Sequence, residues 1–159
     1  MSEEQVEESP IRRLHPMPRS LPAFLMRARE AVMTRVRPVL RAYDMTEPQW
    51  RVLRTLASVE QLEVTQLAEM VFLLPSSLSR ILKDLTERGL IQRRTSAADL
   101  RKGLVSISDR GMALIEAATP EAAKVNAEIE KLFGRERMGR LERLLQELEQ
   151  AVGPGRPGD

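Results

Sequence analysis

The sequence of 159 residues contains no cysteine and a single histidine, His15. Without thiols the chain cannot form disulfide bonds, thiolate zinc sites or a cysteine nucleophile. One histidine allows neither a histidine-rich metal site nor a convincing Ser-His-Asp triad. The sequence also lacks a glycine-rich phosphate loop. These absences argue against an enzyme, and we expect no cofactor and no metal.

Long apolar runs and a secretory signal are missing as well. No run approaches the roughly 20 apolar residues that a membrane-spanning helix needs. The first nine residues hold four glutamates and no basic residue, unlike the basic start of a signal peptide. Because the absence of cysteine also fits a reducing compartment, we expect a cytoplasmic protein with no membrane partner.

Aromatic residues make up only 3% of the chain, whereas 30% of the residues are charged. The apolar surface is therefore aliphatic, which suits packed helices better than a β-sandwich. The net charge of +2 is unevenly distributed, because the acidic start leaves the rest of the chain basic. Between Pro75 and Val105, seven Lys or Arg stand against three acidic residues, an excess suited to contact with phosphates.

Apolar residues at three- and four-residue spacing predict several helices. The first begins at Leu21 and continues past Pro38 with a kink. Thr46 and Gln49 have the spacing of a capping box, with Pro48 in the tolerant first turn, and predict the start of a second helix. A short helix is expected over residues 65–71.

The segment from Pro75 to Arg88 is the most regular helix of the sequence, and Gly89 favours the left-handed conformation that ends a helix. We expect one apolar stripe to face the core, made of Leu74, Leu78, Ile81, Leu82 and Leu85. Two short β-compatible segments, 90–95 and 103–108, then predict a hairpin around a basic loop.

Two further helices are expected after the hairpin. Ser108 is the predicted N-cap of the first, in which Pro120 marks a kink or a restart. The last has apolar residues at heptad spacing from Met138 to Val152 and needs an apolar partner, so we expect a homodimer.

The fold class we predict is mainly α with a small β-hairpin wing. The expected organisation begins with a flexible N-terminal arm (1–20) and a dimerisation helix (21–45). A winged helix-turn-helix DNA-binding domain (46–108) follows, then C-terminal dimerisation helices (109–152) and a disordered tail (153–159).

In a helix-turn-helix, the N-terminal half of the second helix enters the major groove and meets base edges. Small hydroxyls and basic side chains on the outer face of the helix 75–88 suit this role. From the helix alone, an ordinary solvent-exposed surface explains these polar residues about as well as DNA binding does. The basic hairpin that follows favours DNA binding. The candidate DNA-binding residues of the helices are Thr65, Gln66, Ser76, Ser77, Ser79, Arg80 and Lys83.

Several short motifs follow one another in the sequence: Leu67-Ala68, Pro75-Ser76, Glu87-Arg88-Gly89-Leu90-Ile91, Arg93-Arg94, Asp99-Leu100-Arg101 and Val105-Ser106-Ile107-Ser108-Asp109-Arg110-Gly111. With these motifs in order and at family spacing, the sequence from about Leu21 to Leu148 resembles the MarR family of winged-helix regulators. The resemblance implies a homodimer on double-stranded DNA with a pseudopalindromic operator. It also implies that Arg101, beside Lys102, enters a minor groove, and that Asp99 pairs with a nearby arginine, for which Arg94 is the candidate.

A narrower resemblance, carried by Ala28-Arg29-Glu30-Ala31, Arg37-Pro38 and Thr46-Glu47-Pro48-Gln49-Trp50-Arg51, is to repressors of aromatic-acid catabolism. It implies an aromatic carboxylate as effector, which would need an apolar wall and a cation. The candidate effector-binding residues are Arg29 and Trp50 first, then Met33, Gln49 and His15. Trp50 as a plain core residue, and a DNA-binding protein without any effector, remain the alternatives.

Overall fold

The computed structural model describes residues 20–95 and 103–153. The chain divides into two compact units, Met1–Thr34 and Arg35–Asp159, and the boundary falls inside the first helix. The expected arm, apart from Ser20, and the expected tail beyond Gly153 lie outside the described residues.

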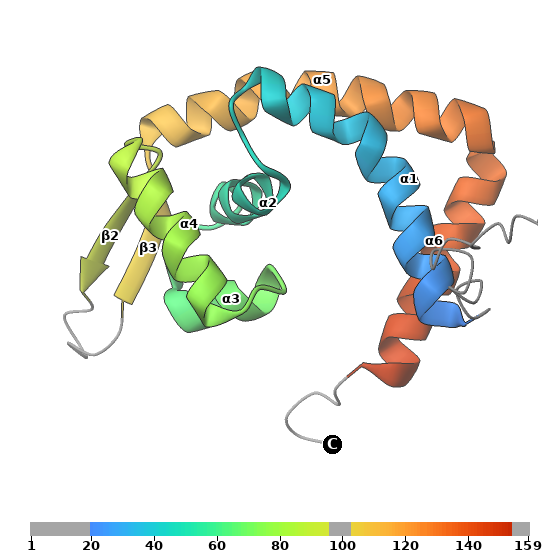
Figure 1. Cartoon of the computed structure of the whole chain (residues 1–159), viewed down its shortest axis with the longest axis horizontal. Helices are drawn as coiled ribbons and strands as arrows, with labels where there is room; N and C mark the ends of the chain where they lie inside the picture. The colour runs from blue at the N-terminus through green and yellow to red at the C-terminus, as the bar shows by residue number, and fades with distance from the viewer. Residues whose placement is uncertain (1–19, 96–102, 154–159) are drawn as a thin grey trace, which may run out of the picture. The chain divides into compact units, whose positions relative to one another are not determined.

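Helices dominate the described residues, and a small sheet accompanies them, so the predicted fold class is confirmed (Figure 1). The elements are α1 (Leu21–Ala42), α2 (Glu47–Leu56), β1 (Leu62–Glu63), α3 (Val64–Met70), α4 (Pro75–Glu87), β2 (Ile91–Thr95), β3 (Gly103–Ile107), α5 (Asp109–Phe133) and α6 (Arg135–Val152).

Local sequence signals set several of these boundaries as predicted. The Thr46 hydroxyl accepts a hydrogen bond from the Gln49 backbone N–H, and the Gln49 side chain accepts one from the Thr46 N–H, which forms the full capping box of α2. The Ser108 hydroxyl accepts from the Gly111 N–H at 3.0 Å and so caps α5. After α4, Gly89 adopts a φ of 69°.

Two expectations about the helices need correction. Pro120 lies inside α5, which continues unbroken, so a restart of the helix at that point is wrong. The break instead comes at Gly134, whose φ of 96° separates α5 from α6. Leu74 does not belong to the inward stripe of α4: it is the N-cap residue, in extended conformation, and its side chain is 73% exposed.

The sheet is antiparallel, with strand order β1-β3-β2. β2 and β3 form the predicted hairpin, in register from Ile91 opposite Ile107 to Thr95 opposite Gly103. β1, a strand of two residues that pairs with β3, was not predicted. The loop 96–102, which joins the hairpin strands, lies outside the described residues.

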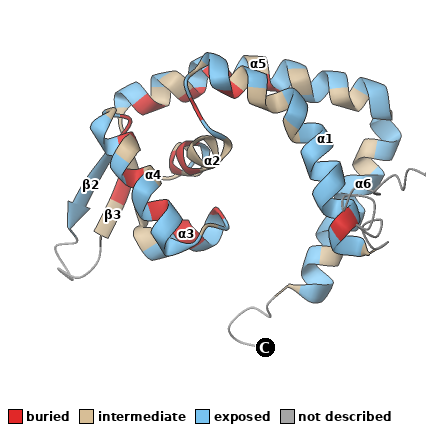
Figure 2. Ribbon diagram, in the orientation of Figure 1, coloured by how far each residue is buried: buried red, intermediate tan, exposed pale blue. Residues whose placement is uncertain are grey.

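The core of the second unit is formed by residues of α2, α3, α4, α5 and the sheet, with Leu40 from the end of α1 (Figure 2). Its fully buried side chains are mostly leucines, and no polar or charged side chain is buried among the described residues. α6 differs from the other helices because it has no buried residue. Large apolar residues are exposed along α6 and at the end of α5, where a protein partner would remove them from water: Leu132, Phe133, Leu141, Leu144, Leu145 and Val152.

Candidate DNA interface and effector residues

The recognition helix of the expected helix-turn-helix is α4, which has one buried and one exposed face. Leu78, Leu82 and Leu85 are completely buried and fix the rotation of the helix about its axis. As a consequence, all five candidate DNA contacts of this helix are exposed: Ser76, Ser77, Ser79, Arg80 and Lys83. The arrangement leaves a hydroxyl-rich N-terminal half, followed by basic side chains, available to a ligand as large as a duplex.

The two basic candidates of α4, Arg80 and Lys83, differ in their surroundings. Lys83 lies 3.9 Å from the Glu87 carboxylate, and both side chains are largely exposed, so this ion pair contributes little and yields easily to a phosphate. Arg80 stands one turn nearer the N-terminus of α4, where a recognition helix meets base edges. Arg80 is therefore the better candidate for a base contact and Lys83 for a phosphate contact.

The candidates outside α4 are only partly described. Thr65 and Gln66 are exposed in the first turn of α3, where the Gln66 side-chain oxygen accepts a hydrogen bond from the Glu63 N–H. Arg94 is exposed on β2, and its guanidinium donates to the Gln92 side-chain oxygen at 3.4 Å. Asp99, Arg101 and Lys102 lie outside the described residues, so the expected pairing of Asp99 with Arg94 stays a prediction.

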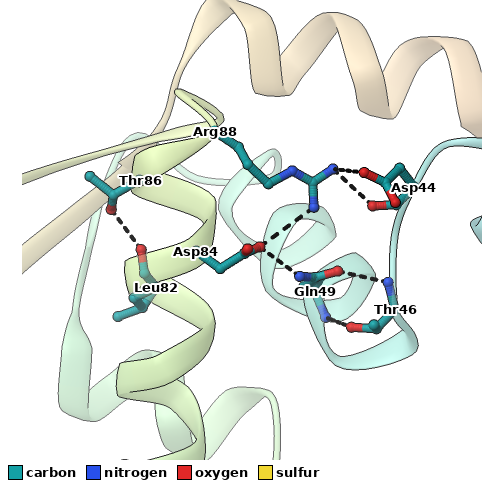
Figure 3. A network of polar contacts seen from close by, with 7 residues as sticks. All are labelled: Asp44, Thr46, Gln49, Leu82, Asp84, Thr86 and Arg88. Carbon is teal, nitrogen blue, oxygen red and sulfur yellow. Dashed lines mark hydrogen bonds and ion pairs between the residues drawn. The ribbon is translucent and has the colours of Figure 1, made fainter.

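A polar network that the sequence did not reveal joins α4 to the start of α2 (Figure 3). The Gln49 amide donates to the Asp84 carboxylate at 2.7 Å. The Arg88 guanidinium donates to the Asp44 main-chain carbonyl at 2.8 Å and, more weakly, to Asp84 at 3.5 Å. Because Asp44 precedes the capping box of α2 and Gln49 belongs to it, the network holds the C-terminal half of α4 against the turn between α1 and α2.

The candidate effector residues fall on both units. Arg29 and Met33 belong to the first unit, with Arg29 exposed and Met33 half-buried. Gln49 and Trp50 belong to the second, and His15 lies outside the described residues. The structure therefore leaves the grouping of these five residues as a prediction.

Within the second unit, Trp50 is half-buried and packs against the core, which agrees in part with the plain core role. The Trp50 ring also contacts Arg54, a residue that was not among the candidates predicted from the sequence. The guanidinium carbon of Arg54 lies 5.6 Å from the centre of the Trp50 ring, one helical turn further along α2. The i,i+4 spacing of the two residues was the available signal. An apolar ring and a positive charge, the two requirements for an aromatic carboxylate, thus lie side by side.

Comparison with known proteins agrees with this architecture. Residues 43–102 match the model of the MarR family. Over 144 residues the chain is 35% identical to the homoprotocatechuate degradative operon repressor of Escherichia coli, covering 88% of this chain and 97% of that protein. The chain belongs to the MarR family.

Two solved structures extend the comparison of this MarR-family protein. The crystal structure of NadR in complex with 4-hydroxyphenylacetate is 35% identical and superposes with a TM-score of 0.71, covering 84% of this chain and 95% of NadR. The transcriptional repressor CouR, bound to a 23-mer DNA duplex, is 25% identical with a TM-score of 0.76, covering 81% of this chain and 92% of CouR. In the part of the chain that the structure describes, no helix combines the length and apolarity needed to cross a membrane.

Proposed function

We propose that this MarR-family protein is a cytoplasmic homodimeric repressor of an aromatic-acid catabolic operon, which leaves its operator when it binds an aromatic carboxylate. It acts by binding and not by catalysis. The observation that carries the proposal is the match over nearly the whole length of a repressor named for homoprotocatechuate degradation. The 4-hydroxyphenylacetate bound to NadR is likewise an aromatic carboxylate.

The DNA surface of the proposal is the exposed face of α4 together with the wing. Ser76, Ser77, Ser79 and Arg80 contact base edges, and Lys83 contacts phosphate. Thr65 and Gln66 approach the backbone of the duplex from α3. Arg101, with Arg94, Asp99 and Lys102 around it, reaches the minor groove. The exposure of every described member of this set supports the assignment.

For the effector, Arg29 is the proposed partner of the carboxylate and Trp50 the proposed partner of the ring, with Met33, Gln49 and His15 in supporting contacts. Arg54 joins this set because its charge already lies on the Trp50 ring. Gln49 has a second part to play, since its side chain is bonded to Asp84 of α4. A shift of the first turn of α2 on ligand binding would pass directly to the recognition helix through this bond.

The test is a titration of a complex between the protein and its promoter DNA with hydroxyphenylacetate- and hydroxycinnamate-type acids. Because Trp50 is the single tryptophan, its fluorescence reports ligand binding in the same samples. A coupling of about 1–3 kcal/mol, typical of allosteric pairs, would weaken DNA binding about 5–150-fold.

Arg29→Ala should abolish this response and leave DNA affinity unchanged, because Arg29 lies outside the winged helix. Arg27→Ala is the matched control: Arg27 is a basic residue of the same helix whose guanidinium lies over Phe24. If the wild-type protein binds DNA and no acid releases it, a constitutive DNA-binding protein is the better interpretation. If Arg29→Ala responds normally, only the anchor is misassigned.

A further inference from the structure

The turn between α3 and α4 exposes two large apolar side chains. Phe72 is 80% exposed and Leu74 is 73% exposed, the largest exposed fractions, with Val152, among the exposed large apolar residues of the described chain. The other exposed large apolar residues, apart from Met70, lie in α1, α5 and α6, the predicted dimerisation helices. We call Phe72 and Leu74 the apolar turn.

Neither stability nor burial explains the residue types in the apolar turn. Phe72 has a φ of 51°, in the left-handed region that glycine adopts freely and bulky residues adopt only at a cost. Leu74 occupies the N-cap of α4 and makes no side-chain capping bond, where serine, threonine, aspartate or asparagine would stabilise the helix. At both positions, therefore, another residue would give a more stable fold: glycine in place of Phe72, and a capping residue such as serine in place of Leu74.

The position of the apolar turn points to its partner. Leu74 directly precedes Pro75 and the hydroxyl-bearing first turn of α4, so the apolar turn continues the proposed DNA-reading surface. On the major-groove edge of a base pair, the apolar group is the C5-methyl of thymine, which Ala, Thr and Phe side chains contact. Two side chains are too few for a stable protein interface, which buries about 800 Å² on each partner.

We propose that Phe72 and Leu74 determine operator specificity by contacting thymine methyl groups at the end of the major-groove site next to the N-terminus of α4. The inference rests on the proposed function, because it requires a DNA-bound α4. A hollow of about 430 Å³ lies beside the two side chains, between α3 and the start of α4, and its lining includes Thr65, Leu73 and Pro75. This hollow gives the methyl groups room to approach.

The experiment begins with the wild-type dimer and a library of random DNA duplexes, from which the protein selects its operator. Each thymine of the selected half-sites is then replaced by deoxyuridine, which lacks only the methyl group. We expect one or two of these replacements to weaken wild-type binding about fourfold each, the change that corresponds to burial of one methyl group. Deoxyuridine outside the half-sites is the control on the DNA side.

On the protein side, Phe72→Gly and Leu74→Ser should unfold at the same or higher urea concentration than wild type, because one relieves the positive φ and the other supplies an N-cap. Their DNA affinity should nevertheless fall, and the deoxyuridine effect should disappear. Leu74→Met, which keeps an apolar contact, should retain both the DNA affinity and the deoxyuridine effect. Arg80→Ala should lose affinity and keep the deoxyuridine effect, since its contact is polar.

The outcomes separate the two proposals. If the wild-type protein selects no sequence, the proposed function fails and the inference fails with it. If it selects an operator and Phe72→Gly and Leu74→Ser respond to deoxyuridine as wild type does, the inference alone is overturned. A change of oligomeric state in these variants, or a changed aromatic-acid response with unchanged DNA affinity, would also overturn it, by identifying a second copy or a small ligand as the occupant.

Discussion

Replacement of Arg88 by alanine should destabilise the protein through one hydrogen bond. The Arg88 side chain is 26% exposed, and its guanidinium donates to the Asp44 main-chain carbonyl at 2.8 Å. A hydrogen bond that involves a charged group contributes about 1.5–3 kcal/mol to stability. The contact with the Asp84 carboxylate, 3.5 Å away and half-exposed, adds at most about 1 kcal/mol. The fully exposed Asp44 carboxylate adds nothing measurable.

We therefore expect Arg88→Ala to lower the free energy of unfolding by about 2–3 kcal/mol. Urea unfolding followed by circular dichroism measures this value, with all variants at one protein concentration because the stability of a dimer depends on it. Arg88→Lys should give an intermediate loss of stability, because the lysine ammonium cannot hydrogen-bond to Asp44 and Asp84 at the same time.

Lys83→Ala is the matched control, because Lys83 is also a basic residue of α4 with an acidic partner. Its ion pair with Glu87 is long and exposed, so the loss should stay within about 0.5 kcal/mol. Equal losses for Arg88→Ala and Lys83→Ala would refute the reasoning, because they would show that the bond to the α1–α2 turn does not anchor α4.

Three other predictions concern DNA binding, packing and assembly. Arg101→Ala should reduce the slope of log affinity against log salt by about 0.9 if one phosphate contact is lost; an unchanged slope in filter binding would exclude that contact. Gly111→Ala should cost about 1–3 kcal/mol in urea unfolding, because the added Cβ would lie 2.1 Å from the Leu90 carbonyl oxygen; a variant as stable as wild type would contradict this close approach. Leu145→Glu in α6 should convert a micromolar dimer into monomer in sedimentation, whereas a wild-type monomer would disprove the dimer.

Much of the fold was predictable because its signals are local. The capping box of Thr46 and Gln49, the N-cap Ser108 and the left-handed Gly89 each act within four residues, and each marks the boundary that the structure has. The buried face of α4 can be read from apolar spacing, and with it the exposure of the five candidate DNA contacts on the rest of the helix.

The missed features depend on contacts between distant segments. β1 is two residues long and exists because β3 pairs with it. The bonds from Asp84 and Arg88 reach residues 35 and 44 positions earlier in the chain, which no periodicity reveals. Leu74 was misplaced for a local reason: its spacing from Leu78 fits a helical stripe only if residue 74 is helical, and an N-cap residue is not.

The junction of Gly89, Leu90, Ser108 and Gly111 has a consequence for how operators of different spacing can arise. There the Ser108 hydroxyl donates to the Gly89 carbonyl at 2.7 Å, the Ser108 N–H donates to the Leu90 carbonyl, and Gly111 leaves no room for a side chain. These contacts tie the end of α4, the base of the wing and the start of α5 to one another, so we expect the three to move as one body. A related protein that binds operators with more widely spaced half-sites would therefore differ in the length or bend of α5 beyond this junction. The junction itself would stay the same.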